Sequence, residues 1–167
     1  MILLQETMCS SYLAIHAFSK LLPNWELCAT SAFGLSGGLL TAWNPRKVRC
    51  RAYETLADIL VKAKLCGMAA ILDIINCYGP YKDRDDFWEK VHKGGLVNSP
   101  HLILGGDLNL TMNASKIWGA KAVLDPLASF FKNLFYSVGL IDVAPSITGP
   151  TWRNGRVGDH GINKRLD

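Results

Sequence analysis

The side chains best suited to work on a phosphate group are Asp107 and Asn109, which follow the apolar run 102–104 and two glycines. Residues two apart on an extended chain project to the same side, so this acid and this amide would point off a strand end together. A carboxylate can orient or deprotonate a water, and an amide can hold a phosphoryl oxygen. Gly105 and Gly106 carry no side chains and would let a bulky ligand approach the backbone.

Glu6 and Tyr78 stand at the ends of two further apolar stretches, 1–4 and 69–77. If these stretches share one layer with the Asp107 strand, the polar ends meet in one pocket. The Glu6 carboxylate is a hard oxygen ligand suited to Mg²⁺, which proteins usually hold through one or two carboxylates plus a substrate phosphate. The Tyr78 hydroxyl could donate a hydrogen bond to the same charge. Singly, each residue is more often structural, because Gly, Asp and Asn are also common turn residues; the prediction rests on the set.

The apolar spacing predicts the elements that would position these residues. Strands are expected at 1–4, 25–30, 39–43, 48–55, 59–65, 69–77 and 102–104, and helices at 11–22, 84–93 and 127–138. The last helix has the clearest helical period in the chain. Residues 34–38 and 113–123 are expected to be loops, and Asn154-Gly155 predicts a tight hairpin. No closing element is expected after residue 163.

Length and composition bound the remaining possibilities. A chain of 167 residues fits one domain, 1–167, and its 49% hydrophobic and 19% charged residues argue against disorder. The formal charge of +4 permits a polyanionic partner without implying one. Five scattered cysteines and four scattered histidines show neither a disulfide framework nor zinc-ligand spacing, which agrees with a reducing, intracellular compartment, the nucleus included. No apolar run is long enough to cross a membrane, and no protein partner is indicated.

The motifs taken together resemble the endonuclease/exonuclease/phosphatase superfamily, most closely the endonuclease domain of plant LINE-type retrotransposons. The resemblance covers nearly the whole chain, in the family's order. It rests on Gln5-Glu6-Thr7, Asn76-Cys77-Tyr78-Gly79-Pro80, Gly106-Asp107-Leu108-Asn109, Thr151-Trp152 and Arg165-Leu166-Asp167, with Gly37-Gly38-Leu39 and Trp43-Asn44-Pro45 as further support.

This resemblance implies an α/β fold, a four-layer α/β sandwich of the DNase I-like type with two largely antiparallel sheets between helices. It implies Mg²⁺-dependent hydrolysis of a phosphodiester, with DNA as the substrate and nucleic acid as the partner. The implied roles are a Mg²⁺ ligand for Glu6, a phosphate contact for Tyr78, positioning of the attacking water for Asp107, binding of the scissile phosphate for Asn109, and orientation of a catalytic histidine for Asp167.

The sequence also departs from the family pattern. The family begins with an Asn-bearing strand and ends with a Ser-Asp-His element, neither of which is found here. Asp159-His160 precedes Asp167, which is the wrong order, so we expect a loop there. Loss of a general acid or base costs roughly 10²–10⁴ in rate, so we expect a domain incomplete at both termini, with weak or no activity. Two alternatives stay open: a non-catalytic nucleic-acid- or protein-binding remnant, and a phosphatase of the same superfamily. By the resemblance Trp152 would lie near the nucleic acid, although a core position is the commoner one for tryptophan.

Overall fold

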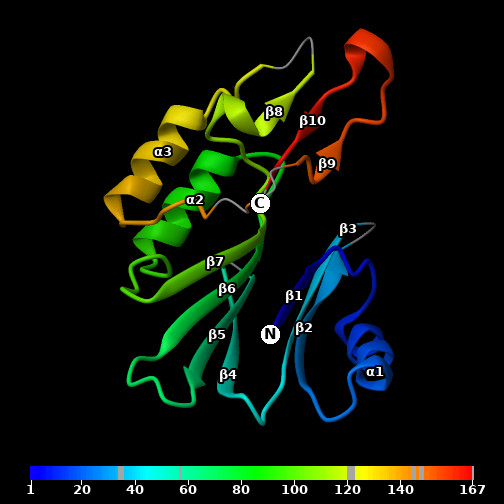
Figure 1. The fold of residues 1–167 in the computed structure, drawn as a ribbon, viewed down its shortest axis with the longest axis vertical. Coiled ribbons are helices and arrows are strands. Elements are labelled where there is room, and N and C mark those ends of the chain that lie inside the picture. Colours follow the sequence, from blue (N-terminus) through cyan, green and yellow to red (C-terminus); the bar gives the residue numbers. More distant parts are fainter. Residues whose placement is uncertain (34–35, 57, 120–122, 144–145, 147–148, 167) are drawn as a thin grey trace. The chain divides into compact units, whose positions relative to one another are not determined.

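The computed structural model describes residues 1–167 except 34–35, 57, 120–122, 144–145, 147–148 and 167, and shows a mixed α/β chain (Figure 1). Its helices and strands are β1 (Ile2–Gln5), α1 (Ser11–Leu21), β2 (Glu26–Phe33), β3 (Ser36–Trp43), β4 (Val48–Thr55), β5 (Asp58–Leu65), β6 (Leu72–Tyr78), α2 (Arg84–Lys93), β7 (Leu102–Asp107), β8 (Ile117–Trp118), α3 (Ala128–Ser137), β9 (Trp152–Arg153) and β10 (Asn163–Lys164). Short 3₁₀ turns occupy Ala114–Lys116 and Gly158–His160.

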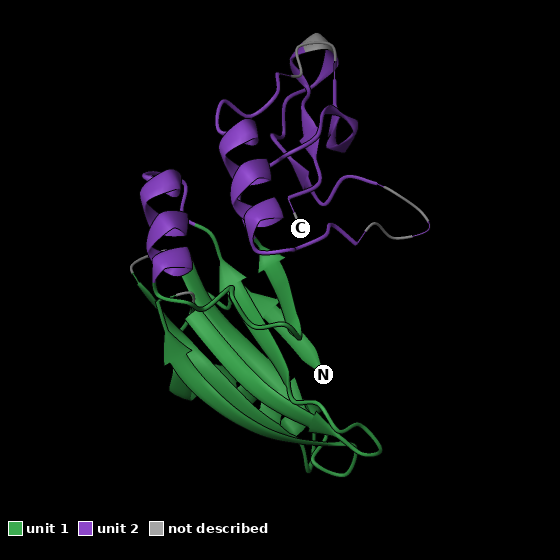
Figure 2. Cartoon of the chain, turned by 90° about the vertical axis from the view of Figure 1, so that its left-hand side faces the viewer, with its two compact units in different colours: residues 1–79, 94–107 green, residues 80–93, 108–167 purple. Residues whose placement is uncertain are grey.

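The chain divides into two compact units (Figure 2). The first comprises Met1–Gly79 and Gly94–Asp107, and the second comprises Pro80–Lys93 and Leu108–Asp167. Each unit is described by itself below. A single domain over residues 1–167 stays a prediction.

Two sheets pack against each other in the first unit. One has the strand order β1-β3-β2 and is antiparallel, and the other has the order β4-β5-β6-β7, in which only the β6–β7 pair is parallel. The seven strands lie where the apolar spacing predicts them, with ends that differ by at most three residues. The prediction works because β-branched and aliphatic residues alternate along the strands, or run continuously where both faces are covered. Between the sheets lies an apolar core that includes Leu39, Trp43, Ile59, Val61 and Ile74.

Helix α1 covers the outer face of the β1-β3-β2 sheet. Its first turn is capped by Ser10, whose hydroxyl accepts a hydrogen bond from the Leu13 N–H at 3.3 Å. Ala14 of the helix packs with buried residues of β2 and β3, a second core. The first unit therefore supplies three layers of the predicted four-layer sandwich: α1 and the two sheets. The remaining α-helices of the described chain, α2 and α3, belong to the second unit.

The second unit is built on the contact between α2 and α3. The indole of Trp88, fully buried, meets the Phe135 ring edge to face with centroids 5.4 Å apart. Both helices match their sequence-based predictions within two residues, since their apolar residues recur at helical spacing. The other part of the unit is a small antiparallel sheet in the order β8-β10-β9.

The predicted tight hairpin at Asn154-Gly155 is wrong. β9 pairs with β10 instead, with Arg153 opposite Asn163, so the connection spans residues 154–162. The Asn154 side chain organises this wider loop: its oxygen accepts hydrogen bonds from the Arg156 and Ile162 N–H groups, both at 3.1 Å, and its amide donates to the His160 carbonyl at 2.9 Å. Asparagine side chains often bond the backbone of their own loop, and here these bonds stabilise a nine-residue loop in place of a two-residue hairpin turn.

Several smaller predictions also need correction. Ser36, Gly37 and Gly38 belong to β3 instead of a loop, while Gly34 and Leu35 lie outside the described residues. The predicted loop 113–123 contains β8, and residues 163–164 form β10, because both segments pair with each other in a sheet whose partners are distant in sequence. The Trp152 side chain is 37% exposed, so the core position is wrong. No helix in the described part of the chain is long and apolar enough to cross a membrane.

Candidate functional site

Three of the predicted site residues stand at neighbouring strand ends in the first unit. Glu6 follows β1, Tyr78 closes β6 and Asp107 closes β7. The Tyr78 hydroxyl donates a hydrogen bond to Glu6 Oε1 at 2.6 Å. Tyr78 and Asp107 are register partners in the parallel β6–β7 pair, and the Gly79 N–H donates to the Asp107 carbonyl at 2.8 Å. The structure thus brings together residues that are far apart in the sequence.

Glu6 reaches Tyr78 because a buried amide fixes β1 against β6. The Gln5 side chain donates to Asn76 Oδ1 at 2.6 Å, and the fully buried Asn76 amide donates to the Leu4 carbonyl at 3.3 Å, the Leu40 carbonyl at 3.2 Å and Thr41 Oγ1 at 3.1 Å. These bonds fix the position of β1 along its own axis relative to β6 of the opposite sheet. At Glu6 the backbone turns into the left-handed region (φ 54°), which ends the strand and leaves the carboxylate exposed.

Asp107 belongs to the face of β7 that looks toward β1. Gly105, two residues earlier and on the same face, is so close to β1 that an added Cβ would lie 3.0 Å from Leu3 Cδ1. Gly106, at φ 129°, leaves no room for a side chain because a Cβ there would overlap the Cys77 carbonyl. The space predicted for an approaching ligand at these glycines is therefore filled by the protein itself, and both glycines serve close packing.

A half-buried carboxylate supports the backbone of Tyr78. Asp58 Oδ2 accepts a hydrogen bond from the Tyr78 N–H at 2.8 Å. Burial raises the pKa of the Asp58 carboxyl, and the hydrogen bond from Tyr78 opposes that rise. Burial and then the negative charge of Asp58 raise the pKa of the neighbouring Cys77 thiol, so the thiol stays protonated and is no nucleophile at neutral pH.

Asn109, another predicted site residue, does not belong to this unit. Asn109 lies in the second unit, 7% exposed, with a left-handed backbone (φ 51°). Its carbonyl accepts a hydrogen bond from Arg84 Nη1 at 2.9 Å. Asp167 lies outside the described residues. Chain connectivity alone keeps Asn109 close to Asp107, because two residues span at most ~7 Å.

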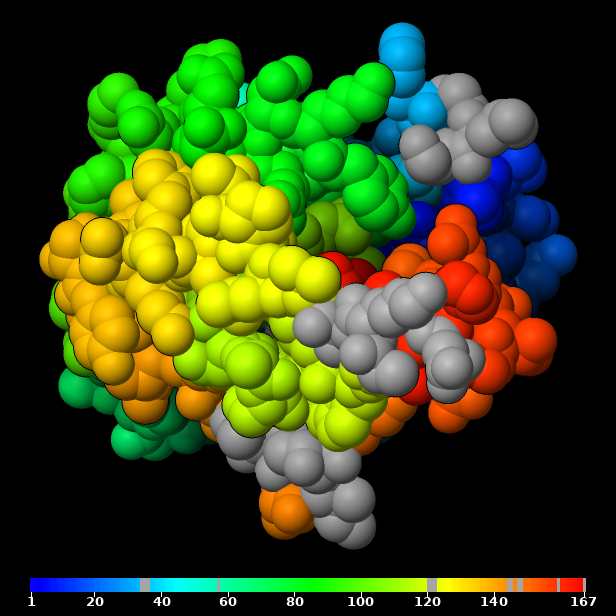
Figure 3. Space-filling model, turned by 90° about the horizontal axis from the view of Figure 1, so that it is seen from above, coloured from blue at the N-terminus to red at the C-terminus, as the bar shows by residue number. Residues whose placement is uncertain are grey.

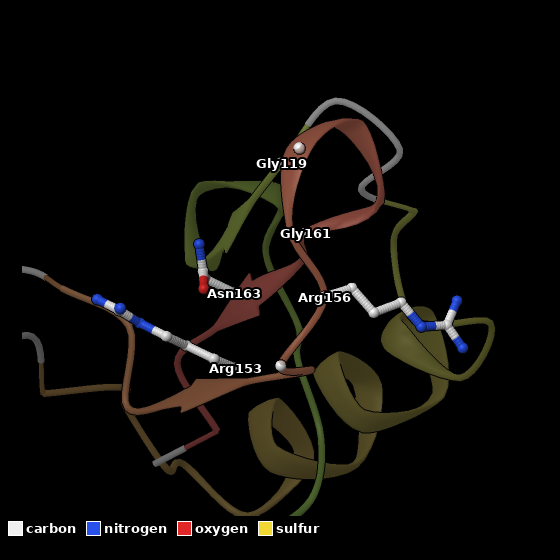
Figure 4. A pocket seen from close by; sticks show the side chains of 7 residues that line it. Gly119, Arg153, Arg156, Gly161 and Asn163 are labelled. Carbon is white, nitrogen blue, oxygen red and sulfur yellow. The ribbon is translucent and has the colours of Figure 1, made fainter.

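A cavity of about 620 Å³ lies elsewhere in the second unit, at the β8-β10-β9 sheet. It is lined by Gly119, Arg153, Gly155, Arg156, Gly158, Gly161 and Asn163. The segment that carries most of these residues, orange to red in Figure 3, lies at the molecular surface. Figure 4 shows the Arg153 and Arg156 side chains extending in opposite directions, so they offer two separate cations and do not converge on one anion.

The chemistry of the first-unit residues fits a hard divalent cation. The described residues contain no group of three or more His, Cys, Asp or Glu side chains placed to hold a metal ion. Mg²⁺ needs fewer, because water and substrate phosphate fill most of its coordination shell. The exposed Glu6 carboxylate, with one oxygen bonded to Tyr78, is a ligand of the required kind.

Sequence reasoning missed the residues that hold the site in place. Asn76 carries a detectable signal, since it is a polar residue inside the apolar run 72–77. Asp58 and Arg84 carry none, because each acts on a backbone group 20 or 25 residues away.

Comparison with known proteins identifies the fold. No family model matches the sequence, and no curated protein does. Among solved structures, the endonuclease domain of TRAS1, a telomere-specific non-LTR retrotransposon, superposes with a TM-score of 0.62 and 17% identity over 96% of this chain and 77% of that one. The fold is DNase I-like. The predicted α/β fold class is thus confirmed.

Proposed function

We propose that this chain is a Mg²⁺-dependent phosphodiester hydrolase of the endonuclease type that acts on DNA. The observation that carries the proposal is the 2.6 Å hydrogen bond between Tyr78 and Glu6 beside the register partner Asp107. An exposed carboxylate, a phenol and a second acid at neighbouring strand ends can serve phosphoryl transfer to water as metal ligand, hydrogen-bond donor and base. The DNase I-like fold, shared with an endonuclease domain, supports this choice among hydrolases.

In the proposed reaction, Asp107 orients a water and accepts its proton as the water oxygen bonds to phosphorus. The opposite P–O ester bond breaks, the leaving oxygen takes up a proton from solvent to become a hydroxyl, and Asp107 later returns its proton to solvent. Once substrate is bound, Tyr78 turns its single O–H from Glu6 to a phosphoryl oxygen, and Asn109 hydrogen-bonds another. The negative charge on these oxygens grows in the transition state. Asp167 would orient a catalytic histidine, a role that rests on the family resemblance alone.

Glu6 is the proposed magnesium ligand. When bound, Mg²⁺ would neutralise charge on the phosphate. The chain's own contribution is to hold the Glu6 carboxylate still: Tyr78 fixes one oxygen, and the Gln5–Asn76 bond fixes the preceding residue. A ligand held in this way loses less conformational freedom when the cation binds.

A nucleic-acid partner agrees with the charge distribution. The chain has a formal charge of +4, and the second unit exposes Arg153 and Arg156 beside a surface cavity. Two cations that extend in different directions suit successive phosphates of a backbone better than a single small anion. Trp152, the residue before Arg153, is exposed and can contact a base or sugar.

The test is a single-turnover assay with protein in excess over supercoiled plasmid, because the departures from the family pattern predict slow turnover. We expect nicking that requires Mg²⁺, stops with a chelator, and falls by roughly 10²-fold or more in Asp107→Ala. Glu54→Ala, which removes an exposed acid of the same unit, is the matched control and should leave the rate unchanged.

The same protein samples separate the alternatives. Equal rates for the wild type and Asp107→Ala would overturn the proposal. Salt-sensitive DNA binding that survives Asp107→Ala, without nicking by any variant, would identify a binding remnant. Release of phosphate from a phosphoinositide, with plasmid left intact, would identify a phosphatase.

A further inference from the structure

An ion pair in the second unit holds the backbone of Asn109. Arg84 and Asp125 bond at two points, with Nη1–Oδ2 at 2.5 Å and Nη2–Oδ1 at 2.9 Å. Their side chains are 19% and 5% exposed, so the pair is largely withdrawn from water. The same Arg84 Nη1 donates to the Asn109 carbonyl at 2.9 Å. One guanidinium thus joins α2, the segment after β7 and the segment before α3.

The pair is itself held rigidly. Asp125 Oδ1 also accepts a hydrogen bond from the Leu127 N–H at 3.0 Å, just before α3 begins. The Arg84 guanidinium carbon lies 5.7 Å from the centre of the Phe131 ring, over its face. The planar guanidinium is thereby fixed on three sides: by a carboxylate, a carbonyl and an aromatic ring. A lysine could not reproduce this arrangement, because an ammonium lacks the planar fork.

Asn109 needs such support. Its backbone has a φ of 51°, in the left-handed region that asparagine tolerates better than most L-residues, and its carbonyl is withdrawn from water with the rest of the residue. A buried carbonyl without a partner is costly, so the hydrogen bond from Arg84 favours this conformation over extended alternatives. The direction of the Asn109 side chain follows from the backbone that Arg84 fixes.

We propose that Arg84, held by Asp125, is a positioning residue that sets the backbone of Asn109 and thereby aims its amide at the scissile phosphate. This inference rests on the proposed function for the role of Asn109, while the positioning itself is a property of the fold. A displacement of about 1 Å at a substrate-binding group can cost on the order of 10²-fold in rate, so the arrangement matters for turnover.

The test compares Arg84→Lys with Phe135→Leu. The second variant weakens the α2–α3 contact in the same unit without touching Arg84, Asp125 or Asn109, and so controls for lost stability. Both are assayed at a temperature where circular dichroism shows them folded. We expect Arg84→Lys to lower kcat by roughly 10- to 100-fold with KM changed less than about twofold, while Phe135→Leu retains the wild-type kcat. Asp125→Asn, a milder change, should shift kcat in the same direction and covers the case in which Arg84→Lys fails to fold.

A second readout does not depend on activity. The Leu110 N–H belongs to the peptide group whose carbonyl is that of Asn109, so its ¹⁵N chemical shift reports the hydrogen bond from Arg84. We expect this resonance to move in Arg84→Lys and Asp125→Asn and to stay in place in Phe135→Leu. An unmoved Leu110 resonance, or equal losses of kcat in Arg84→Lys and Phe135→Leu, overturns the positioning role. A wild type without nuclease activity overturns the proposed function and leaves the Leu110 result to decide the positioning.

Discussion

The Gln5 side-chain amide donates a hydrogen bond of 2.6 Å to the Asn76 oxygen and so joins β1 of one sheet to β6 of the other. Asn76 is fully buried, and its own amide donates hydrogen bonds to the Leu4 and Leu40 carbonyls and the Thr41 hydroxyl. A polar group in this position specifies how the two sheets align, because any other alignment would leave several buried groups unpaired. The alignment matters here because it delivers Glu6 to Tyr78.

The first prediction concerns this bond network. Asn76→Leu preserves size but leaves donors and acceptors on β1 and β3 without partners, and should lower the free energy of unfolding by about 2–4 kcal/mol. Chemical denaturation measures the change. Lys62→Ala, which breaks the half-exposed ion pair with Asp73 on the neighbouring strands, should cost less than about 1 kcal/mol. Similar losses for both variants would show that the Asn76 network contributes little.

The elements of this fold could be predicted where the signal is local. The helix α3 follows from apolar residues at helical spacing, and the strand prediction that follows the turn at Asn44-Pro45 matches β4 at its observed bounds. The pairing of β9 with β10 could not be predicted in this way. Asn154-Gly155 is a strong local signal for a tight turn, but the Asn154 side chain bonds its own loop and overrides it.

In the candidate site, too, some residues could be predicted from the sequence and their contacts could not. Glu6, Tyr78 and Asp107 stood out because each polar residue follows an apolar run, and their order matched a known family. Their mutual contact spans 72 residues of sequence between Glu6 and Tyr78, which no local pattern encodes. The Arg84–Asp125 pair spans 41 residues and leaves no trace in periodicity, so only the three-dimensional structure reveals it.

The second prediction concerns the magnesium dependence of nicking. Glu6→Gln removes the charge of the proposed ligand and should raise the Mg²⁺ concentration for half-maximal nicking by roughly tenfold or more, the scale seen when metal-site residues are altered. Tyr78→Phe, which removes only the hydroxyl bonded to Glu6, should act in the same direction. The control is Glu54→Gln on β4. An unchanged Mg²⁺ dependence in Glu6→Gln would remove this residue from the metal site.

The third prediction concerns Gly106. Gly106→Ala places a Cβ against the Cys77 carbonyl and forces alanine to a φ of 129°, so the free energy of unfolding should fall by about 2–5 kcal/mol. Gly67→Ala is the matched control, since Gly67 also has a positive φ (85°) but faces open space. Gly67→Ala should lower the free energy of unfolding by about 1–2 kcal/mol, the cost of the positive φ without any steric overlap. Equal losses of unfolding free energy for the two variants in urea denaturation would mean that β6 and β7 can move apart at Gly106 without cost.

The last prediction concerns stability in acid. Burial by itself raises the pKa of the Asp125 carboxyl, but the hydrogen bonds from Arg84 and Leu127 and the charge of Arg84 prevail and hold this pKa below its ordinary value. A carboxyl whose pKa is lower in the folded chain binds protons more readily when unfolded. Its contribution is therefore complete above the unfolded pKa of about 3.9 and is lost as the pH falls toward the folded value.

Asp125→Asn should accordingly reduce the free energy of unfolding at pH 7. The difference from the wild type should shrink as the pH falls below about 4, where the Asp125 carboxyl of the unfolded wild type takes up a proton while that of the folded chain is still charged. Urea denaturation at a series of pH values measures both curves. Asp86→Asn provides the comparison, because Asp86 pairs with Lys90 on an exposed helix face and should change stability by less than about 1 kcal/mol at any pH. Parallel curves for the wild type and Asp125→Asn would mean that the charge of Asp125, and with it the ion pair to Arg84, contributes nothing to the folded state.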